Sequence, residues 1–301
     1  MKDEHVALVA LLRTRPAKLS WRKLTEQVLD YGSAAEVWAL HNPEQLLPSE
    51  ESTRALEEAR SDLARWEENG LQFISVLDTE FPQRLLDIVE TPPFVVAQGH
   101  LVSNDLGLSV VGSRKASPRG LEMAQGIAHS IASAGLTVIS GMAAGIDTAA
   151  HTAALAAGGR TVAFVATGSL RTYPAANRPL HEAIADHGLV LSQFWPEAAP
   201  AKHSFLMRNA LMSGYGLATI VVEAGETSGA RAQARMAVEH GRPVILTDMV
   251  VERNDWARGL LNRPGVSVAS SIREISSIVE QIREQPVRTD EALRVLAQAY
   301  R

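Results

Sequence analysis

The sequence predicts an α/β fold in which a parallel sheet is covered by helices on both faces. From residue 107 onwards, six short apolar segments alternate with longer amphipathic segments. Nearly continuous apolar strands separated by helices are typical of a parallel sheet that is buried on both sides. Several of these strands run into turns rich in glycine and small hydroxyl side chains. Because ligands of such sheets bind beyond the carboxyl ends of the strands, these turns are the candidate functional region.

The first part of the chain predicts a compact helical module instead. Apolar periodicity indicates helices at 6–12, 20–29, 34–40 and 52–66, and Ser20 is a candidate cap for the second of them. Such a module either docks a partner or nucleic acid, or it serves only as a packing cap. The residues leave both interpretations open.

Residues 70–106 form a bridge with two short predicted strands, at 73–77 and 94–97, broken by Phe81-Pro82 and Pro92-Pro93. The strands predicted after the bridge are 107–112, 136–140, 161–166, 189–193, 219–223 and 243–247. The helices predicted between and after them are 117–134, 146–157, 177–187, 204–214, 229–241 and 271–284, with a further possible helix at 289–299. We therefore expect a helical module at 1–68, a linker at 69–106, the α/β domain at 107–285 and a short tail at 286–301.

Composition excludes several classes of protein. The chain of 301 residues contains no cysteine, which rules out a disulfide framework, a thiolate zinc site and a cysteine nucleophile. Hydrophobic residues make up 46%, enough for a large core, and we find no signal peptide or membrane-spanning run. We expect a cytoplasmic protein.

The net charge of −5 argues against a uniformly basic nucleic-acid-binding protein. The charge is uneven, because residues 1–106 hold 10 Lys and Arg against 18 Asp and Glu, whereas residues 107–250 hold 11 against 9. Clustering of cations on one face, not the overall charge, decides whether phosphates bind.

The first candidate site is the turn Gly112-Ser113-Arg114, between a strand and a helix. Gly112 permits a tight turn and close approach of a ligand to the backbone. The Ser113 hydroxyl and the free amides of the next helix could hold one phosphate oxygen, and Arg114 could clamp another. An ordinary turn with a solvated arginine remains an equal alternative.

Two further turns repeat the pattern. Gly141 follows one strand, and Asp147 stands near the start of the next helix, where capping is a commoner role for an aspartate than acid catalysis. Ser228 and Gly229 again offer a hydroxyl and free amides after the strand that ends at Glu223. We interpret Glu223 and the nearby Glu226 as groups that orient an arginine or a hydroxyl, not as acid/base catalysts.

The remaining candidates lie around Gly168 and in the segment Lys202 to Asn209. A cation at Lys202, an aromatic ring at Phe205 and Arg208 on the next turn suit a contact with a phosphate and a stacked base. From these residues alone, a buried Phe205 and a solvated Lys202 are the simpler interpretation. For Tyr173, which precedes a proline, we favour a structural turn.

Known nucleotide and metal motifs are missing from the chain. It has neither the Gly-x-Gly-x-x-Gly fingerprint nor a Walker P-loop, and its histidines show no metal-ligand spacing. We therefore expect no metal site.

Taken together and in this order, the motifs resemble the DprA (Smf) family of DNA-processing proteins. The shared features are Gly112-Ser113-Arg114, Ser140-Gly141-Met142-Ala143-x-Gly145-Ile146-Asp147, Gly168-x-x-x-x-Tyr173-Pro174-x-x-Asn177, Phe205-x-x-Arg208-Asn209 and Glu223-Ala224-x-x-x-Ser228-Gly229, together with the helical module and the linker. The resemblance covers roughly residues 5 to 250.

This resemblance implies an extended Rossmann-like domain with an N-terminal helical, SAM-like module. It implies a homodimer that binds and protects incoming single-stranded DNA and loads the RecA recombinase onto it in natural transformation. It also implies no catalytic residue, no catalytic turnover and no cofactor. By position, Ser113 and Arg114 resemble phosphate ligands, and Lys202 and Phe205 resemble the family's cation and stacking ring. Arg208-Asn209 and Ser228-Gly229 resemble the remaining walls of the site.

The chain departs from the family pattern at Ala210, at the run 230–233, at Thr247-Asp248 and at Gln193. Only about fifty residues follow Asp248, so we expect no complete C-terminal winged helix. These departures keep an alternative open: a Rossmann-like enzyme or sensor for a nucleotide-derived small molecule, with Asp147 or Glu223 as its acid or base.

Overall fold

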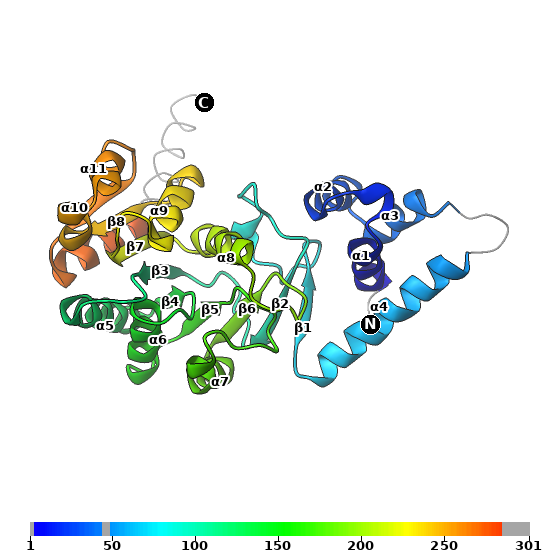
Figure 1. Cartoon of the computed structure of the whole chain (residues 1–301), viewed down its shortest axis with the longest axis horizontal. Helices are drawn as coiled ribbons and strands as arrows, with labels where there is room; N and C mark the ends of the chain where they lie inside the picture. The colour runs from blue at the N-terminus through cyan, green and yellow to red at the C-terminus, as the bar shows by residue number, and fades with distance from the viewer. Residues whose placement is uncertain (1–2, 44–48, 285–301) are drawn as a thin grey trace, which may run out of the picture. The chain divides into compact units, whose positions relative to one another are not determined.

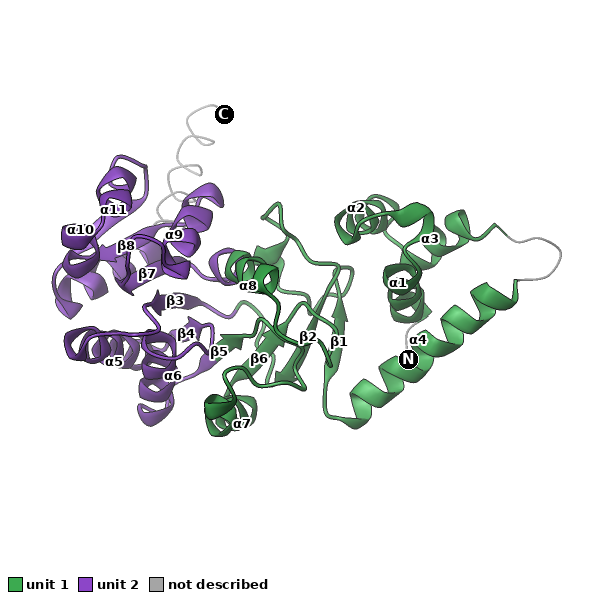
Figure 2. Cartoon of the chain, in the orientation of Figure 1, with its two compact units in different colours: residues 1–104, 162–211 green, residues 105–161, 212–301 purple. Residues whose placement is uncertain are grey.

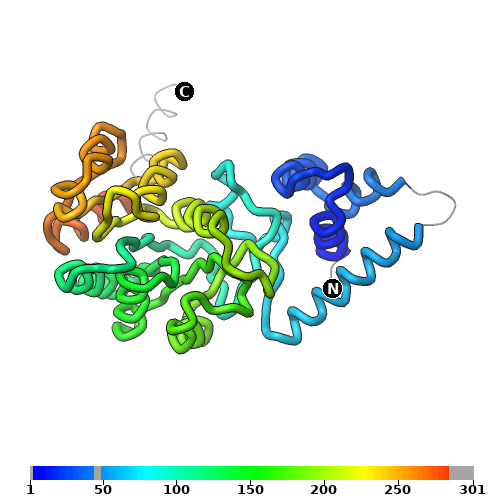
Figure 3. Tube along the Cα trace, in the orientation of Figure 1, coloured from blue at the N-terminus to red at the C-terminus, as the bar shows by residue number. Residues whose placement is uncertain are grey.

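The computed structural model describes residues 3–43 and 49–284 (Figure 1). They divide into two compact units, one formed by residues 1–104 and 162–211 and the other by residues 105–161 and 212–301 (Figure 2). Each unit is built from two separate segments of the chain. The order of these segments can be followed by colour along the trace in Figure 3. The linear division at residues 68, 106 and 285 stays a prediction.

The first unit begins with four helices, as the apolar periodicity predicts. They are α1 (Asp3–Thr14), α2 (Trp21–Tyr31), α3 (Ala34–His41) and α4 (Glu50–Glu68). Serine hydroxyls cap three of them, because Ser20, Ser33 and Ser49 each accept a hydrogen bond from the amide three residues later. The apolar run at 6–12 of α1 is buried throughout, which makes α1 the centre of the module.

The first unit continues with strands in the order β1-β2-β6-β5. The antiparallel members are β1 (Gln72–Ser75) and β2 (Phe94–Gly99), whereas β5 (Thr161–Phe164) and β6 (Leu189–Ser192) pair in parallel. The other helices of this unit are α7 (Arg178–His187) and the first part of α8 (Lys202–Tyr215).

An aromatic cluster joins the four helices to these strands. The ring of Trp195 stacks on Phe94 at 4.9 Å and on Trp66 at 5.6 Å, and Trp21 meets it edge-on at 5.1 Å. Burial of such large rings contributes most of the packing energy of a small interface. The helical module is therefore packed onto the strands by aromatic side chains.

The second unit is a parallel sheet in the order β4-β3-β7-β8-β9. Its strands are β3 (Gly107–Gly112), β4 (Thr137–Ser140), β7 (Ala218–Glu223), β8 (Val244–Thr247) and β9 (Val266–Ala269). Its helices are α5 (Pro118–Ser133), α6 (Ile146–Ala156), α9 (Gly229–Glu239), α10 (Asp248–Arg253), α11 (Asp255–Leu260) and a helix at 272–284. In Figure 1, α5 and α6 lie on one side of these strands and α9 on the other.

The predicted fold class is confirmed. Nine strands, mostly parallel, alternate with helices behind an N-terminal helical region, and each predicted strand lies within about two residues of its expected position. The short elements β9, α10 and α11 were not predicted. The possible helix at 289–299 and the tail at 286–301 lie outside the described residues, and the expected lack of a winged helix stays a prediction.

Candidate functional site

Three of the predicted turns follow neighbouring parallel strands of the second unit. Strand β3 lies between β4 and β7, and the chain passes from β3 to β4 on one side and later returns to place β7 on the other. The strand order therefore reverses at β3, which is where open α/β sheets bind their ligands. The turns that carry Ser113, Gly141 and Ser228 all leave the carboxyl ends of these three strands.

Backbone hydrogen bonds tie the turn after β3 to the end of β7 and to the start of α6. The amide of Ser113 donates to the carbonyl of Glu223 at 2.7 Å, and its carbonyl accepts from the amide of Ile146 at 3.2 Å. The Ser113 hydroxyl accepts from the amide of Lys115 at 3.1 Å, which leaves the hydroxyl proton to be donated outward. Arg114 and Lys115 are exposed beside it, so the turn presents a hydroxyl and two cations.

Gly112 has no room for a side chain. A Cβ there would lie 2.6 Å from the side chain of Ile146 and 2.8 Å from the carbonyl oxygen of Glu223. The register of β3 against β7 also shifts at this residue, where Gly112 faces Glu223. The glycine is thus required for the close packing that orients the Ser113 turn.

The carboxylate of Glu223 accepts hydrogen bonds from Ser117, the residue that caps α5. Its Oε2 accepts from the Ser117 hydroxyl at 2.6 Å and from the Ser117 amide at 3.1 Å, while the Ser117 hydroxyl caps Gly120 at 3.1 Å. The amide of Ser117 and the cap of α5, which we expected to be open to a phosphate, are therefore already paired. The Glu223 carboxylate thus bonds a hydroxyl group, that of Ser117.

The turn after β4 is built around Asp147, which is 5% exposed. Its Oδ2 accepts from the amides of Gly141 at 3.1 Å and Ala143 at 3.3 Å. Asp147 was expected to cap α6, but the cap residue is Gly145, whose φ of 82° and closeness to Ser113 exclude a side chain. Asp147 instead lies within the first turn of α6, and its carboxylate accepts hydrogen bonds from the loop that precedes this helix.

The turn after β7 ends in a capped helix. The Ser228 hydroxyl accepts from the amide of Arg231 at 3.3 Å, and the Arg231 guanidinium donates to the Glu226 carbonyl at 2.9 Å. A Cβ on Gly229 would meet nothing within 4 Å, so this position is open. The Glu226 carboxylate accepts from the amide of Asp255 at 2.6 Å and thus caps α11.

The other predicted residues lie in the first unit, where Gly168 is fixed by close packing. Its amide donates to the carbonyl of Ala198 at 2.9 Å. A Cβ on Gly168 would come within 2.1 Å of the Trp195 carbonyl and 2.2 Å of the Pro196 carbonyl. Gly168 therefore allows two loops to touch.

The candidate residues on helix α8 differ in how much of their side chain is exposed to solvent. Lys202 is exposed at its first residue, and Phe205 is half-buried with its ring 5.7 Å from that of Tyr173, edge to face. Arg208 is only 6% exposed and donates to the carbonyl of Phe164 at 2.9 Å and to Asn209 Oδ1 at 3.1 Å. Arg208 and Asn209 thus brace the end of β5, whereas Lys202 faces solvent.

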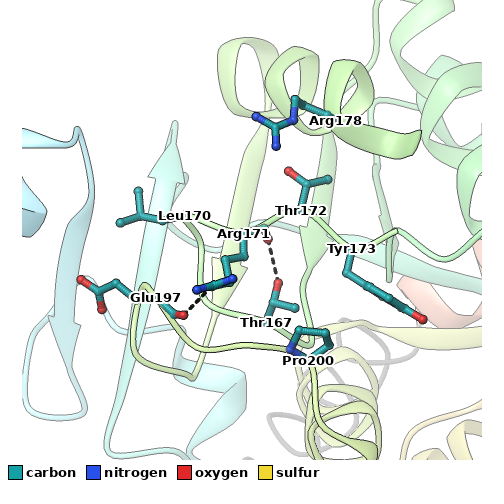
Figure 4. Close-up of a pocket in the computed structure, with 8 residues that line it drawn as sticks. All are labelled: Thr167, Leu170, Arg171, Thr172, Tyr173, Arg178, Glu197 and Pro200. Carbon is teal, nitrogen blue, oxygen red and sulfur yellow. Dashed lines mark hydrogen bonds between the residues drawn. The ribbon is translucent and has the colours of Figure 1, made fainter. Parts of the chain in front are cut away.

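Sequence reasoning missed the side chains around Tyr173. This residue was interpreted as a structural turn, yet its side chain is 46% exposed and lines a pocket with Arg171 and Arg178 (Figure 4). The available signal was an arginine two residues before an aromatic ring, in the loop that follows a predicted strand.

Among the described residues, no cluster of three or more His, Asp or Glu side chains is arranged to hold a metal ion. Within the same part of the chain, no helix combines the length and apolarity that a membrane span requires.

Comparison with known families gives one match that covers most of the chain. Residues 72–283 match the family model described as DNA recombination-mediator protein A. The chain is 34% identical over 185 residues to the DNA processing protein DprA of Bacillus subtilis, and 38% identical over 175 residues to that of Streptococcus pneumoniae. These alignments cover 61% and 57% of this chain. With Protein Smf of Synechocystis sp. included, the chain spans 47 to 62% of the length of these curated relatives.

Solved structures agree with the fold. The X-ray structure of DNA processing protein A from Streptococcus pneumoniae has a TM-score of 0.70 and 26% identity, covering 92% of this chain and 98% of the other. A structure that concerns the single-stranded DNA binding mode of DNA processing protein A from Helicobacter pylori has a TM-score of 0.62 and covers 70% of this chain and 96% of the other. At 24% identity, the second match supports the fold alone.

Proposed function

Since the chain belongs to the DNA recombination-mediator protein A family, known as DprA or Smf, we propose that it binds single-stranded DNA and acts without catalytic turnover. In this proposal it protects incoming DNA and loads the RecA recombinase onto it, during natural transformation or another recombination pathway in the cytoplasm. It acts as a homodimer formed through the α/β domain.

The observation that carries the proposal is the turn after β3. A hydroxyl donor at Ser113 and exposed cations at Arg114 and Lys115 stand at the carboxyl end of the strand where the order reverses. Guanidinium and hydroxyl groups suit phosphate oxygens, and contacts with phosphates supply most of the affinity of sequence-independent binding. The Ser228 hydroxyl at the start of α9 offers a second contact in the same unit, and no side chain covers the neighbouring Gly229 position.

Helix α8 supplies the second support, in the first unit. The exposed Lys202 precedes a half-buried ring at Phe205 by three residues, the spacing of neighbours on one helix face. A cation for the backbone beside a ring for a base is a common arrangement for binding single strands. In this proposal Gly112 and Gly141 shape the contact in the second unit, whereas Gly168, Arg208 and Asn209 shape the contact in the first unit. Their packing and hydrogen bonds hold the turns of each unit in place.

The alternative of an enzyme or sensor for a small nucleotide requires Asp147 or Glu223 as acid or base. Asp147 accepts two backbone amides, and Glu223 accepts the hydroxyl and amide of Ser117. Both carboxylates therefore hold turns of the backbone in place through hydrogen bonds. Because an acid or base must transfer a proton to a ligand, this arrangement favours DNA binding over catalysis.

The proposal is tested by fluorescence polarisation with a labelled oligothymidine at several salt concentrations. Arg114→Ala and Lys202→Ala should each weaken binding about 10- to 100-fold and lower the slope of log affinity against log salt by about 0.7 per lost phosphate contact. Arg54→Ala is the control, since Arg54 lies exposed on α4 and pairs only with Glu58 among the interactions described. Affinities of both variants equal to wild type would refute the proposed site.

The RecA step and the dimer need separate measurements. Pull-down of purified RecA by the full chain, with and without oligonucleotide, tests recruitment, and sedimentation equilibrium tests the stoichiometry. No retention of RecA in either condition would contradict the loading role without affecting the DNA site.

A further inference from the structure

The link between α1 and α2, in the helical module of the first unit (Figure 1), concentrates positive charge in an otherwise acidic region. Residues 1–106 hold ten Lys and Arg, and five of the ten fall within the eleven residues 13–23, which contain no Asp or Glu. We call the segment 13–23 the basic loop. Its cations are all exposed, and they are Arg13, Arg15, Lys18, Arg22 and Lys23.

Hydrogen bonds fold the basic loop into a compact turn. The amide of Lys18 donates to the carbonyl of Arg15 at 2.9 Å, and Arg15 Nε donates to the carbonyl of Leu19 at 3.0 Å. The Trp21 indole donates to the carbonyl of Leu12 at 3.1 Å, which holds the first residue of α2 against the end of α1. The cations on both sides of the turn are therefore held in one part of the surface.

Three residues of the basic loop have left-handed backbone angles although none of them is glycine. The angle φ is 48° at Arg15, 51° at Ala17 and 58° at Lys18. Glycine adopts this region without strain, whereas residues with a Cβ adopt it at a cost in conformational energy. Two of these strained positions thus carry long cationic side chains that a purely structural turn does not need. Strained residues of this kind cluster at binding sites.

Ion pairs within the module neutralise only part of the charge of the basic loop. Arg13 pairs with Asp62 on α4 and so serves the packing of the module. Arg22 and Lys23 share a single carboxylate, that of Glu26, at 3.1 and 2.7 Å. Because one carboxylate carries one charge, this group of three side chains keeps an excess of one positive charge.

Arg15 and Lys18 are the least neutralised cations of the basic loop. Within the described residues, no carboxylate lies at ion-pair distance from either side chain. Together with Arg22 and Lys23 they set four cations against the one carboxylate of Glu26, an excess of three positive charges. Guanidinium and ammonium groups with so little compensation attract phosphate oxygens.

The basic loop offers this charge without an exposed ring or an apolar anchor. Its one aromatic residue, Trp21, packs against the rings of Trp195 and Phe94, with centroids 5.1 and 5.6 Å away. Surfaces for single strands combine cations with rings on which bases stack, whereas a duplex is held through the phosphates on its outside. Among the described residues, no large hydrophobic side chain of 13–23 is exposed, although protein interfaces depend on such anchors. The chemistry therefore fits a duplex better than a single strand or a protein.

We propose that the basic loop binds the phosphate backbone of double-stranded DNA through Arg15, Lys18, Arg22 and Lys23. The contact is independent of sequence, because phosphates carry no sequence information. It uses none of the residues assigned to the single-strand site, so it is a second nucleic-acid contact that does not depend on the first. It also gives the helical module a function beyond packing.

The test measures binding of a labelled blunt-ended duplex to the full chain by fluorescence polarisation at several salt concentrations. Arg15→Gln combined with Lys18→Gln removes two charges and keeps polar side chains at the two left-handed positions. This double variant should bind the duplex about 10-fold more weakly or worse. The slope of log affinity against log salt should fall by about 0.9 per lost phosphate contact. Its affinity for oligothymidine should equal that of wild type.

The matched control is Arg54→Ala combined with Arg60→Ala. Both arginines are exposed on α4, so their loss removes the same net charge from the same module. This control should bind the duplex like wild type. A loss as large as that of the basic-loop variant would assign the effect to net charge and overturn the proposal.

Glu26→Gln tests the same surface by a gain of binding. Glutamine leaves Arg22 and Lys23 without their shared carboxylate, so duplex affinity should rise about 2- to 5-fold. Glu58→Gln is its control, because it releases Arg54 on α4 instead, and it should change nothing. If the double variant fails to fold, judged by thermal unfolding, this pair decides: equal duplex affinities of Glu26→Gln and Glu58→Gln would refute the surface.

The remaining outcomes separate this surface from the proposed function. A double variant that binds the duplex like wild type, or a wild-type chain that binds no duplex, refutes the basic loop and leaves the single-strand site untouched. Loss of duplex and oligothymidine binding by the same factor overturns the assignment to a duplex. If the double variant instead loses self-association in sedimentation at low salt while its duplex binding is unchanged, the partner is an acidic surface of a second copy and the proposal is wrong.

Discussion

The indole nitrogen of Trp66 donates a hydrogen bond of 3.1 Å to the carboxylate of Glu197. Trp66 is 1% exposed near the end of α4, and Glu197 lies in the loop that leads into α8. The Arg65 guanidinium donates to the same oxygen at 3.0 Å. The helical module and the loop before Lys202 are therefore tied at one carboxylate, which gives the module a structural role beside any role in docking partners.

Glu197→Ala should lower the free energy of unfolding by about 1–3 kcal/mol, because the buried indole N–H loses its acceptor. Glu197→Gln keeps an amide oxygen for Trp66 and loses only a half-exposed ion pair, so it should cost less than about 1 kcal/mol. Urea denaturation measures both. Equal losses in the two variants would mean that the pairing with Arg65, not with Trp66, matters.

Ser117→Ala should destabilise the protein more than Ser228→Ala. Both serines cap a helix, which is worth about 0.5–2 kcal/mol, but the Ser117 hydroxyl also donates to the buried Glu223 carboxylate. Loss of that donor should add about 1–2 kcal/mol. Chemical denaturation of the pair provides the comparison, and a larger loss in Ser228→Ala would contradict the role of Glu223.

Gly168→Ala should destabilise strongly, by more than about 2 kcal/mol, since the new methyl group would overlap two backbone carbonyls that cannot rotate away. Gly229→Ala is its control, because the space around Gly229 is open and alanine favours the helix that begins there. That variant should be neutral or more stable by up to about 1 kcal/mol. Thermal unfolding distinguishes them, and comparable melting temperatures would refute the proposed close packing.

His181 should make stability depend on pH below neutrality. Burial lowers the pKa of His181 from its usual value near 6.5, so the unfolded chain takes up the proton first as the pH falls. Unfolding free energy should therefore decline below about pH 6.5, by up to about 1.4 kcal/mol per pH unit until the pKa of the folded state is reached. Above that pH, His181 is neutral in both states and contributes no slope.

His181→Gln removes this titration and should give a shallower decline between pH 7.5 and 5.5 in urea denaturation. Glutamine retains polar atoms for the neighbours of His181, which are Thr172 and Gln98. Identical slopes in the variant and the wild type would assign the pH dependence to other groups.

The sequence predicted the regular elements because their apolar periodicity is strong. Strands β3 and β7 are buried along almost their whole length and are rich in valine, isoleucine and leucine. Helix α5 begins with a serine cap followed by proline, and both are typical of helix starts. In contrast, β9 is a half-exposed edge strand with a serine in its centre, and α10 and α11 have six residues each. Elements this short and this exposed lack a readable period.

The predicted turns were located correctly, but the partners of their side chains were not foreseen. Glu223 and Ser117 are 106 residues apart and meet only because β3 pairs with β7. Asp147 was misjudged because Met142 and Gly145 take positive φ angles, which bring the turn back onto the carboxylate. Such contacts depend on strand order and on backbone angles that composition does not reveal.

The aromatic cluster has a consequence for spectroscopy of this chain. Three of its five tryptophans, Trp21, Trp66 and Trp195, lie within one cluster, and Trp38 belongs to the same unit. Only Trp256 belongs to the other unit. Intrinsic emission will therefore report mostly on how the helical module separates from β1 and β2, whereas far-ultraviolet dichroism averages over both units. Denaturation midpoints that differ between the two signals would reveal units that melt independently.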